Sequence, residues 1–310
     1  MTCERVLIYS YRISGLHVSS ELELPVAIPE APQAKAADVV IRRGPVPMAL
    51  DGATARGPNW EMAGEIFLLR VPRLARFQIA AGRDIVVEIE PGVTDRDAAG
   101  FVLGSVFGIL LHQRGALVLH GAAVAKDGRA VAICGASGEG KSTLAAALCR
   151  DGCAFVTDDI CVVGLDANRR PIVLPDGRQL KLWKQSIDRL DLAQRRGEAV
   201  RESFEKYFIE PSDALGQASP LAAIYVLRGA RPPFQAGIKH LALADAVRAL
   251  DYEAYRPVLR SKIGKKPEML THAAAMLGHV KMFLLVRPRG FEHLDETVAA
   301  VRAHWDALDR

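Results

Sequence analysis

Hydrophobic and polar residues alternate along much of the first ninety residues, which is the pattern of strands with one buried face. Turn residues such as Pro72 and Gly82-Arg83-Asp84 separate the alternating segments. We predict six strands in this region, at Val6–Ser10, Leu16–Leu24, Asp38–Arg42, Glu65–Val71, Ala75–Ala80 and Ile85–Glu90. Pro45–Asn59 is predicted to be a turn-rich loop. Residues 1–92 are therefore expected to form a β-rich N-terminal lobe.

The pattern changes after Pro91-Gly92. Thr94 is a good N-cap for a helix that continues to Gln113, and Gly115 follows its end. Residues 116–125 and 129–134 then read as two strands around a Lys-Asp-Gly turn, which predicts a hairpin. The strand that ends at Cys134 is thus expected to have an antiparallel neighbour. We predict that residues 93–310 form a second domain, of the α/β class with a mixed sheet.

Helical and strand patterns follow each other through the rest of the chain. We predict helices at 141–150, Ser186–Arg195, Ala244–Ala254, Glu268–Gly278 and Phe291–Asp309. Further strands are predicted at Cys153–Val156, Ile160–Val163, Gln179–Trp183, Leu221–Leu227 and Lys281–Arg287. In the strand 179–183, Lys181 and Trp183 alternate with two leucines. The charged segment Arg195–Lys206 is a candidate to cap a nucleotide or admit a peptide.

A glycine-rich loop lies between an apolar strand and a helix rich in Ala and Leu. Its residues are Gly135, Ala136, Ser137, Gly138, Glu139 and Gly140, followed by Lys141, Ser142 and Thr143. Glycines allow successive backbone N–H groups to surround phosphate oxygens, the lysine reaches the β- and γ-phosphates, and the serine hydroxyl suits Mg²⁺. The helix directs the positive end of its dipole at the same anion. The alternative is a tight turn with an incidental lysine.

Two adjacent acids, Asp158 and Asp159, end the short strand that follows this helix. One carboxylate at such a position can face a nucleotide-bound Mg²⁺ while the other accepts a proton. An Asp-Asp pair standing alone would be interpreted as a solvated turn. Its position after the loop favours the functional interpretation.

Composition narrows the class of protein. The 310 residues are 50% hydrophobic, enough for a folded core, and carry a net charge of +4 from 40 Lys and Arg against 36 Asp and Glu. Because these charges are spread along the chain, nucleic-acid binding has little support, and an acidic ligand such as a nucleotide accounts for the balance. The longest apolar run, Ala98–Leu111, is too short for a membrane span.

The cysteines and the first residues indicate the compartment. The five cysteines form no CxxC pair and no zinc pattern, so we interpret them as core residues in a reducing cytosol. They are Cys3, Cys134, Cys149, Cys153 and Cys161. Glu4 and Arg5 precede only a short apolar run, unlike a secretory signal peptide. We expect a soluble cytoplasmic protein.

Three motifs together resemble one kinase family. Leu119-His120-Gly121, the loop 135–142 and Val156-Thr157-Asp158-Asp159 are similar in order and spacing to the kinase domain of HPr kinase/phosphorylase. The resemblance implies a P-loop kinase core of the HPr kinase/phosphoenolpyruvate carboxykinase type that uses ATP and Mg²⁺, and a homo-oligomer. It also implies that Lys141 and Ser142 bind phosphate and Mg²⁺, that Asp158 is the general base and that Asp159 holds the metal. His120, by itself a satisfied strand histidine, would then lie close to the reacting phosphoryl group.

A second resemblance covers most of the chain through looser motifs. The segment from Tyr11-Arg12 to Leu24-Pro25 and Leu180-Lys181-Leu182-Trp183 are similar to smaller HPr-kinase-like proteins found with lasso-peptide biosynthesis. That resemblance implies a peptide substrate phosphorylated on its C-terminal serine. The Glu-x-Arg-Gly segment that accompanies phosphorolysis in the bifunctional family is not found in this sequence.

Five cations fall within Arg256–Lys266, a segment that includes Arg260 and Lys265. A solvated face is one interpretation. The other is that Arg256 or Arg260 reaches the transferring phosphate, because a guanidinium stabilises spread negative charge. We name Arg260 as the candidate.

The predicted function is an ATP-dependent serine kinase acting on a peptide or small protein, with neither nucleic acid nor membrane as partner. Three other functions stay open. A kinase for HPr itself would use the same site, a small-molecule kinase would have a closed acceptor pocket, and a nucleotide sensor would bind ATP without consuming it.

Overall fold

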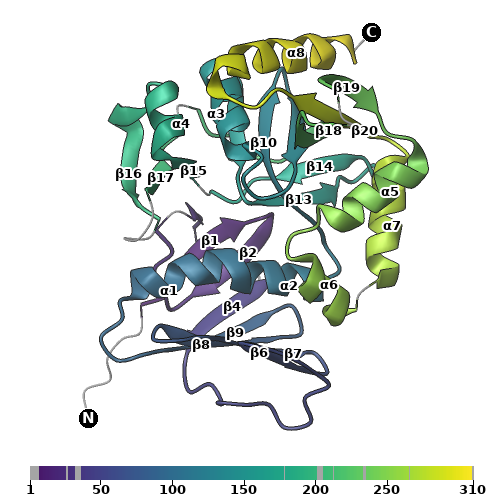
Figure 1. The fold of residues 1–310 in the computed structure, drawn as a ribbon. Helices are drawn as coiled ribbons and strands as arrows, with labels where there is room; N and C mark the ends of the chain where they lie inside the picture. Colours follow the sequence, from purple (N-terminus) through teal and green to yellow (C-terminus); the bar gives the residue numbers. More distant parts are fainter. Residues whose placement is uncertain are drawn as a thin grey trace. The chain divides into compact units, whose positions relative to one another are not determined.

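The computed structural model describes residues 7–25, 27–31, 36–177, 179–200, 205–211, 213–232, 235–264 and 266–308. Residues 1–6, 201–204, Lys265 and Asp309, which were named above, lie outside the described residues. The chain of Figure 1 divides into two compact units. One contains residues up to Ala116 together with Val258–Met269, and the other contains Leu117–Pro257 and Leu270–Arg310.

The first unit is built on a nine-stranded sheet, three strands more than the six predicted in residues 1–92. Its strand order is β3-β1-β2-β4-β9-β8-β7-β6-β5. The strands are β1 Tyr9–Ile13, β2 Leu16–Ser20, β3 Ile28–Pro29, β4 Val39–Arg43, β5 Ala55–Gly57, β6 Trp60–Ala63, β7 Ile66–Val71, β8 Ala75–Ala80 and β9 Asp84–Ile89. Only the β2–β4 and β4–β9 pairs are parallel. The six predicted strands are confirmed with shifted ends.

A helical stretch crosses one face of this sheet in Figure 1. It comprises α1 Asp95–Phe101, the π-helical segment η1 Val102–Val106 and α2 Phe107–Gln113. Thr94 is the N-cap, as predicted, in a reciprocal capping box with Asp97. At the other end the Gln113 amide donates to Glu65 O at 2.9 Å and accepts from Gly82 N–H at 3.0 Å. These bonds keep the stretch with the N-terminal sheet, whereas the sequence analysis grouped it with residues 93–310.

The second unit contains the mixed sheet that the predicted hairpin requires. Its path is β11-β10-β13-β14-β18-β20-β19, with β12 paired to β10 and β11 also paired to β18. The strands are β10 Leu117–Lys126, β11 Arg129–Cys134, β12 Ala154–Thr157, β13 Ile160–Leu165, β14 Pro171–Leu174, β18 Ser219–Gly229, β19 Gly237–His240 and β20 Lys281–Arg287. The β10–β11 pair is antiparallel, whereas β11, β18 and β20 run parallel.

A separate three-stranded antiparallel sheet belongs to the same unit. It contains β15 Leu180–Trp183, β16 Arg196–Ala199 and β17 Lys206–Ile209, in the order β15-β17-β16. Along β15, Leu180 and Leu182 are buried while Lys181 and Trp183 are more exposed, so the predicted alternation is confirmed. The helices of the unit are α3 Lys141–Arg150, α4 Lys184–Arg189, η2 Ala193–Arg195, α5 Leu243–Tyr252, η3 Phe291–His293 and α8 Leu294–Ala307, together with α7 Lys266–Leu277 from Leu270 onward. Helix α6 Pro257–Ile263 falls almost wholly in the first unit.

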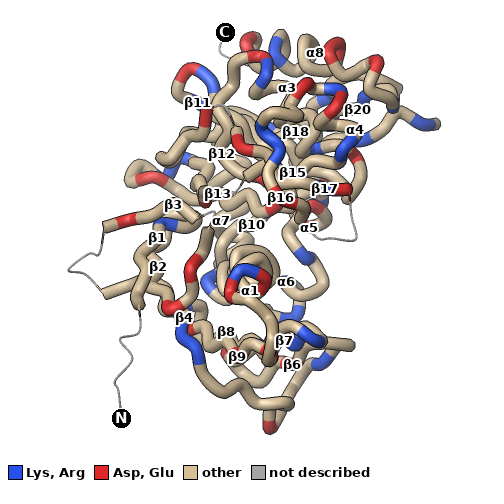
Figure 2. The backbone as a smooth tube through the Cα atoms, turned by 90° about the vertical axis from the view of Figure 1, so that its left-hand side faces the viewer, with Lys and Arg blue, Asp and Glu red and all other residues tan. Residues whose placement is uncertain are grey.

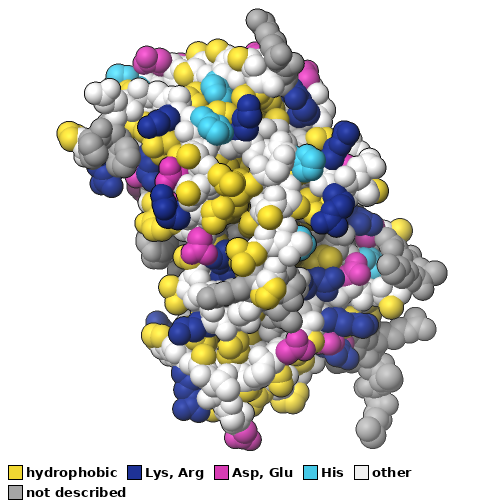
Figure 3. All heavy atoms as spheres, turned by 90° about the vertical axis from the view of Figure 1, so that its right-hand side faces the viewer, with side chains coloured by type: hydrophobic (Ala, Val, Ile, Leu, Met, Phe, Trp, Pro, Cys, Tyr) yellow, Lys and Arg dark blue, Asp and Glu magenta, His cyan; other side chains and the backbone are white. Residues whose placement is uncertain are grey.

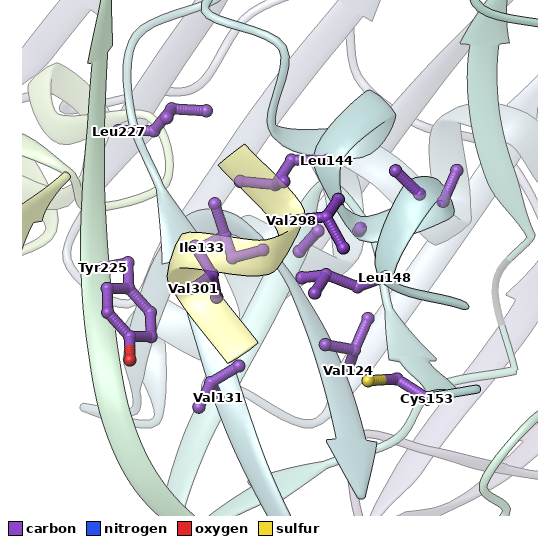
Figure 4. Close-up of a cluster of buried hydrophobic side chains, with 14 of the residues drawn as sticks. Val124, Val131, Ile133, Leu144, Leu148, Cys153, Tyr225, Leu227, Val298 and Val301 are labelled. Carbon is purple, nitrogen blue, oxygen red and sulfur yellow. The ribbon is translucent and has the colours of Figure 1, made fainter. Parts of the chain in front are cut away.

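The core of the second unit holds α3 in place. Figure 4 shows Leu144 and Leu148 of α3 among Val124, Ile133 and Val298, which come from β10, β11 and α8. All five side chains are almost fully buried. Burying each large aliphatic side chain contributes about 1.5–3 kcal/mol, so this cluster anchors the helix that follows the glycine-rich loop.

Some elements were not predicted. Strand β5 lies within the expected loop Pro45–Asn59 and pairs with β6, which directly follows that loop. Trp60 of β6 stacks on Phe67 at 5.4 Å and ties this short hairpin to the sheet. Strands β14, β16, β17 and β19 are each four residues long and lack a clear period. Helix α6 covers most of the cation-rich segment, which the sequence analysis had given no secondary structure.

Charged and apolar side chains are mixed over both units. Figure 2 shows Lys and Arg interspersed with Asp and Glu along the chain. Figure 3, which views the face carrying α5 and α7, shows hydrophobic side chains among charged ones. Leu243, Val247 and Leu270 are exposed there. No described helix is both long enough and apolar enough to cross a bilayer.

Candidate active site

The parallel strands β11, β18 and β20 bring their carboxyl ends to one edge of the sheet. Cys134 pairs with Val226, and Gly229 pairs with Arg287. In α/β sheets this edge is where ligands bind, because the loops that leave it surround a crevice. The glycine-rich loop leaves β11 at this edge and enters α3 at Lys141, the helix start that the sequence predicts.

The loop backbone uses the freedom of its glycines. Gly138 and Gly140 have φ of 85° and 92°, and Gly140 is the N-cap of α3. A Cβ on Gly140 would lie 2.6 Å from Arg287 Nη2, and one on Gly135 would lie 2.7 Å from Leu227 O. The loop is thus packed closely against the ends of both neighbouring parallel strands.

Lys141 turns back onto this loop. Its Nζ donates to Gly135 O at 2.7 Å and to Ala136 O at 3.1 Å, and the residue is only 7% exposed. Burial lowers the pKa of the ammonium, although the nearby Asp158 partly opposes that shift. The lysine therefore carries its charge at the base of the loop, bonded to the loop's own carbonyl groups.

Asp158 faces the start of α3. Ser142 Oγ donates to Asp158 Oδ1 at 2.8 Å, and Lys181 N–H donates to Asp158 Oδ2 at 3.1 Å. The aspartate is 2% exposed. Burial is the largest cause that raises the pKa of its carboxyl, and the charge of Asp159 raises it further. A buried carboxylate at this position would be stabilised by a cation.

Asp159 points to a different set of groups. Its Oδ1 lies 3.4 Å from His120 Nδ1, and its Oδ2 lies 3.3 Å from Lys181 Nζ. The side chain keeps about 29% of its surface exposed. Its backbone has φ of 76°, an uncommon value for a residue other than glycine, and such strained conformations occur often at functional sites.

These groups line one cavity of about 700 Å³, a size typical of small-molecule sites. The cavity lies within the second unit. Its lining residues are His120, Ser137, Gly138, Glu139, Gly140, Lys141, Ser142, Thr143, Asp158, Asp159, Lys181, Trp183, Gln185, Ser186, Val200, Lys206, Gly229, Arg287, Arg289, Gly290, Phe291 and Leu294.

Most of the predicted site residues are thus brought together, while their catalytic roles stay predictions. Gly135 and Ala136 form the base of the loop and bond to Lys141, although they do not line the cavity. Arg260 lies on α6, in the first unit, and is not a lining residue. Its predicted contact with the transferring phosphate stays a prediction.

The sequence analysis missed two arginines at and just after the end of β20, Arg287 and Arg289. Arg287 donates to Glu139 O at 2.9 Å, and Arg289 lies 3.5 Å from Glu139 Oε1. Glu139 in turn accepts from Gly229 N–H at 2.5 Å. The sequence does place Arg287 at the end of the last predicted strand. That position indicates a site residue only when β20 is known to lie beside β18.

The donor set fits a magnesium ion. Ser142, Asp158 and Asp159 offer hard oxygen donors, and Mg²⁺ is usually bound by one or two carboxylates together with phosphate oxygens and water. Among the described residues no group of three His, Cys, Asp or Glu could hold a metal by itself. This arrangement suits a metal that arrives with a nucleotide.

Comparison with known proteins adds one finding. No protein-family model matches the chain, and no curated protein matches it. Among solved structures, the HPr(Ser) kinase/phosphatase from Coxiella burnetii is similar, at 15% identity, over 62% of this chain and 92% of that one, with a TM-score of 0.34. A TM-score this low does not establish a common fold. Membership of the HPr kinase family stays a prediction.

Proposed function

We propose that the chain is an ATP-dependent phosphotransferase that moves the γ-phosphoryl group to a serine hydroxyl of a peptide. The 2.8 Å hydrogen bond between Ser142 and Asp158 is the observation that carries this proposal, because it joins the glycine-rich loop to the acidic pair across one cavity. Phosphoryl transfer needs a phosphate cradle, a metal ligand and a group that takes the acceptor proton. The cavity supplies a candidate for each.

Most of the rate enhancement would come from positioning and charge neutralisation. The N–H groups of the loop and α3 would hold the β- and γ-phosphates, and Lys141 would leave the carbonyls of Gly135 and Ala136 to meet them. A bound Mg²⁺ would neutralise charge that develops on the phosphate oxygens.

The contacts favour a division of roles between the two acids that is the reverse of the predicted one. Asp158 is buried and already bonded to Ser142, so these two side chains would share the metal. Asp159 is more exposed and sits between His120 and Lys181, where an acceptor hydroxyl can reach it. One observation favours the predicted role of Asp158 as the base, because burial raises the pKa of its carboxyl. A metal ion bound beside this carboxyl would lower its pKa again.

Arg287 takes the place that the sequence analysis gave to Arg260. Its guanidinium lies against Gly140 and bonds to Glu139 O, while its Nε is buried without a hydrogen-bond partner among the described groups. A second cation beside the loop would stabilise the spread charge of the transition state. Burial lowers the pKa of this guanidinium, yet an arginine stays charged at neutral pH.

The finer proposal is that the acceptor is the C-terminal serine of a lasso-peptide precursor. Its support is the sequence resemblance described above. A phosphocarrier protein such as HPr, or a small molecule, is the alternative acceptor. The cavity of about 700 Å³ has room for part of an acceptor beside a nucleotide, which does not separate these choices.

Transfer of ³²P from labelled ATP tests both levels of the proposal. The acceptors are a synthetic precursor peptide that ends in serine, the same peptide ending in alanine, and HPr. We expect label in the serine peptide alone, and at least a hundredfold less label with the Lys141→Ala variant. Label in HPr alone would contradict the proposed peptide acceptor but would still support a phosphotransferase activity. Tight ATP binding with no transfer to any acceptor, peptide or small molecule, would overturn the phosphotransferase.

A further inference from the structure

One arm of the cavity lies beyond the groups that would hold a triphosphate. It is formed by Trp183 of β15 and Lys206 of β17, and we call it the Trp183–Lys206 arm. The two residues are cross-strand partners in the β15–β17 pair. The Lys206 ammonium lies 5.9 Å from the centre of the Trp183 ring, within reach of a cation–π contact.

This arm begins at the acidic pair. Lys181 and Trp183 are two residues apart on β15, so their side chains leave the same face of the strand. Lys181 contacts Asp159 through its Nζ and Asp158 through its backbone N–H. A molecule that extends from Asp159 along this face of β15 therefore meets Trp183 and then Lys206.

Another group of lining residues is attached to the phosphate loop. Arg287 and Arg289 bond to Glu139, and Phe291 and Leu294 continue the lining from there. In-line transfer requires the acceptor oxygen and the leaving oxygen on opposite sides of the phosphorus. The loop side then takes the nucleotide, which leaves the side of Asp159 and Trp183 for the acceptor.

The chemistry of the Trp183–Lys206 arm indicates what kind of acceptor it takes. Trp183 is 50% exposed, which is high for so large an aromatic side chain, and half-exposed tryptophans are frequent anchors for partners. Among the described residues no carboxylate forms an ion pair with Lys206, and its ammonium lies near the Trp183 ring. A lysine beside a tryptophan favours a ligand with a negative group close to apolar surface.

We infer that the Trp183–Lys206 arm binds the acceptor, and that the acceptor is a peptide segment with acidic side chains next to the phosphorylated serine. This inference rests on the proposed function. It adds a substrate class and assigns two residues that take no part in the transfer step.

The test uses synthetic serine peptides that differ only in the three residues before the serine, which are all Asp, all Ala or all Lys. Each is made with the serine last and with the serine in the middle. We expect kcat/KM for the Asp peptides to exceed that for the Lys peptides at least tenfold. Lys206→Glu should remove or invert this preference, because it reverses the charge of the arm. The matched control is Lys239→Glu, because Lys239 is exposed on β19 and does not line the cavity. This variant should keep the preference for Asp peptides.

Trp183 gives an independent measurement. Trp183→Ala should raise KM for the Asp peptide at least tenfold and leave the Kd for ATP within twofold, while Trp183→Phe should keep most of the peptide affinity. Loss of ATP affinity with an unchanged peptide KM would make Trp183 a nucleotide-stacking residue and overturn the inference. Equal rates for all three peptides, in the wild type and in Lys206→Glu, would also overturn it while the phosphotransferase stands. If the wild type phosphorylates no peptide at all, the proposed acceptor class falls and the inference falls with it.

Discussion

Ser142 Oγ lies 2.8 Å from Asp158 Oδ1, whereas Asp159 has its carboxylate directed to His120 and Lys181. The two adjacent acids therefore differ in environment, and we expect them to differ in function. A metal ligand and a proton acceptor leave different kinetic signatures when each is replaced by its amide.

We expect Asp159→Asn to lower kcat by about 10²–10⁴ with an unchanged Mg²⁺ dependence, because it removes the proton acceptor. Asp158→Asn should also lower activity, but it should raise the Mg²⁺ concentration needed for half-maximal rate. Steady-state kinetics over a magnesium series checks both. An unchanged magnesium requirement in Asp158→Asn, together with a raised magnesium requirement in Asp159→Asn, would restore the predicted roles.

The buried carboxyl of Asp158 makes stability depend on pH in the absence of nucleotide. Its pKa is raised above 3.8, so between that value and the raised pKa the folded state binds more protons than the unfolded state. The free energy of unfolding should accordingly fall as the pH rises from about 4 through this window. Urea unfolding of the wild type and of Asp158→Asn across pH measures the difference. A parallel pH dependence in the two proteins would contradict the effect of burial.

Two glycines at the ends of α3 form a matched pair. Gly140 and Gly152 have φ of 92° and 91°, but a Cβ on Gly140 would meet Arg287 while one on Gly152 would meet nothing within 4 Å. Both alanine variants should lose about 1 kcal/mol of stability from the backbone conformation. Only Gly140→Ala should also weaken ATP binding, by tenfold or more in calorimetry. Equal ATP affinity in the two variants would show that Gly140 takes no part in ATP binding.

Arg287 offers a test of charge against geometry. Arg287→Lys keeps the positive charge but loses the planar group that bonds to Glu139 O, and Arg287→Ala loses both. We expect kcat/KM for ATP to fall in both, by more in the alanine variant. Arg248→Ala, on an exposed part of α5, is the control and should behave as the wild type. Wild-type kinetics in Arg287→Ala would exclude a contact with phosphate.

Replacing a buried leucine by alanine should cost more stability than replacing an exposed one. Leu144→Ala removes a fully buried side chain from α3 and should cost about 2–5 kcal/mol. Leu243→Ala, on an exposed position of α5, should change stability by less than about 0.5 kcal/mol. Chemical denaturation of the two variants provides the comparison.

The sequence predicted the elements whose patterns are local. The N-cap at Thr94, the hairpin around residues 126–128 and the helix start at Lys141 are each set by a few neighbouring residues, and all three are confirmed. The strand Lys281–Arg287 is confirmed with its predicted bounds. Local preference and tertiary packing agree at these positions.

What could not be predicted depends on distant pairings. Arg287 is 148 residues from Glu139, and its place beside the loop follows from β20 lying next to β18. Trp183 and Lys206 likewise meet only because β15 pairs with β17. Arg260 was chosen for its charge in a cation-rich segment, and charge alone gives no position in space.

The parallel pairing of β11 with β18 has a consequence for how the protein is made. The glycine-rich loop leaves β11 near residue 135, yet its close packing requires Leu227 and Gly229 from the end of β18. During synthesis, a nascent chain that has left the ribosome only as far as β14 has the whole loop sequence without the strand that supports it. Such non-local pairing is slow to form. The loop should therefore become able to bind phosphate only late in synthesis, after β18 has been translated.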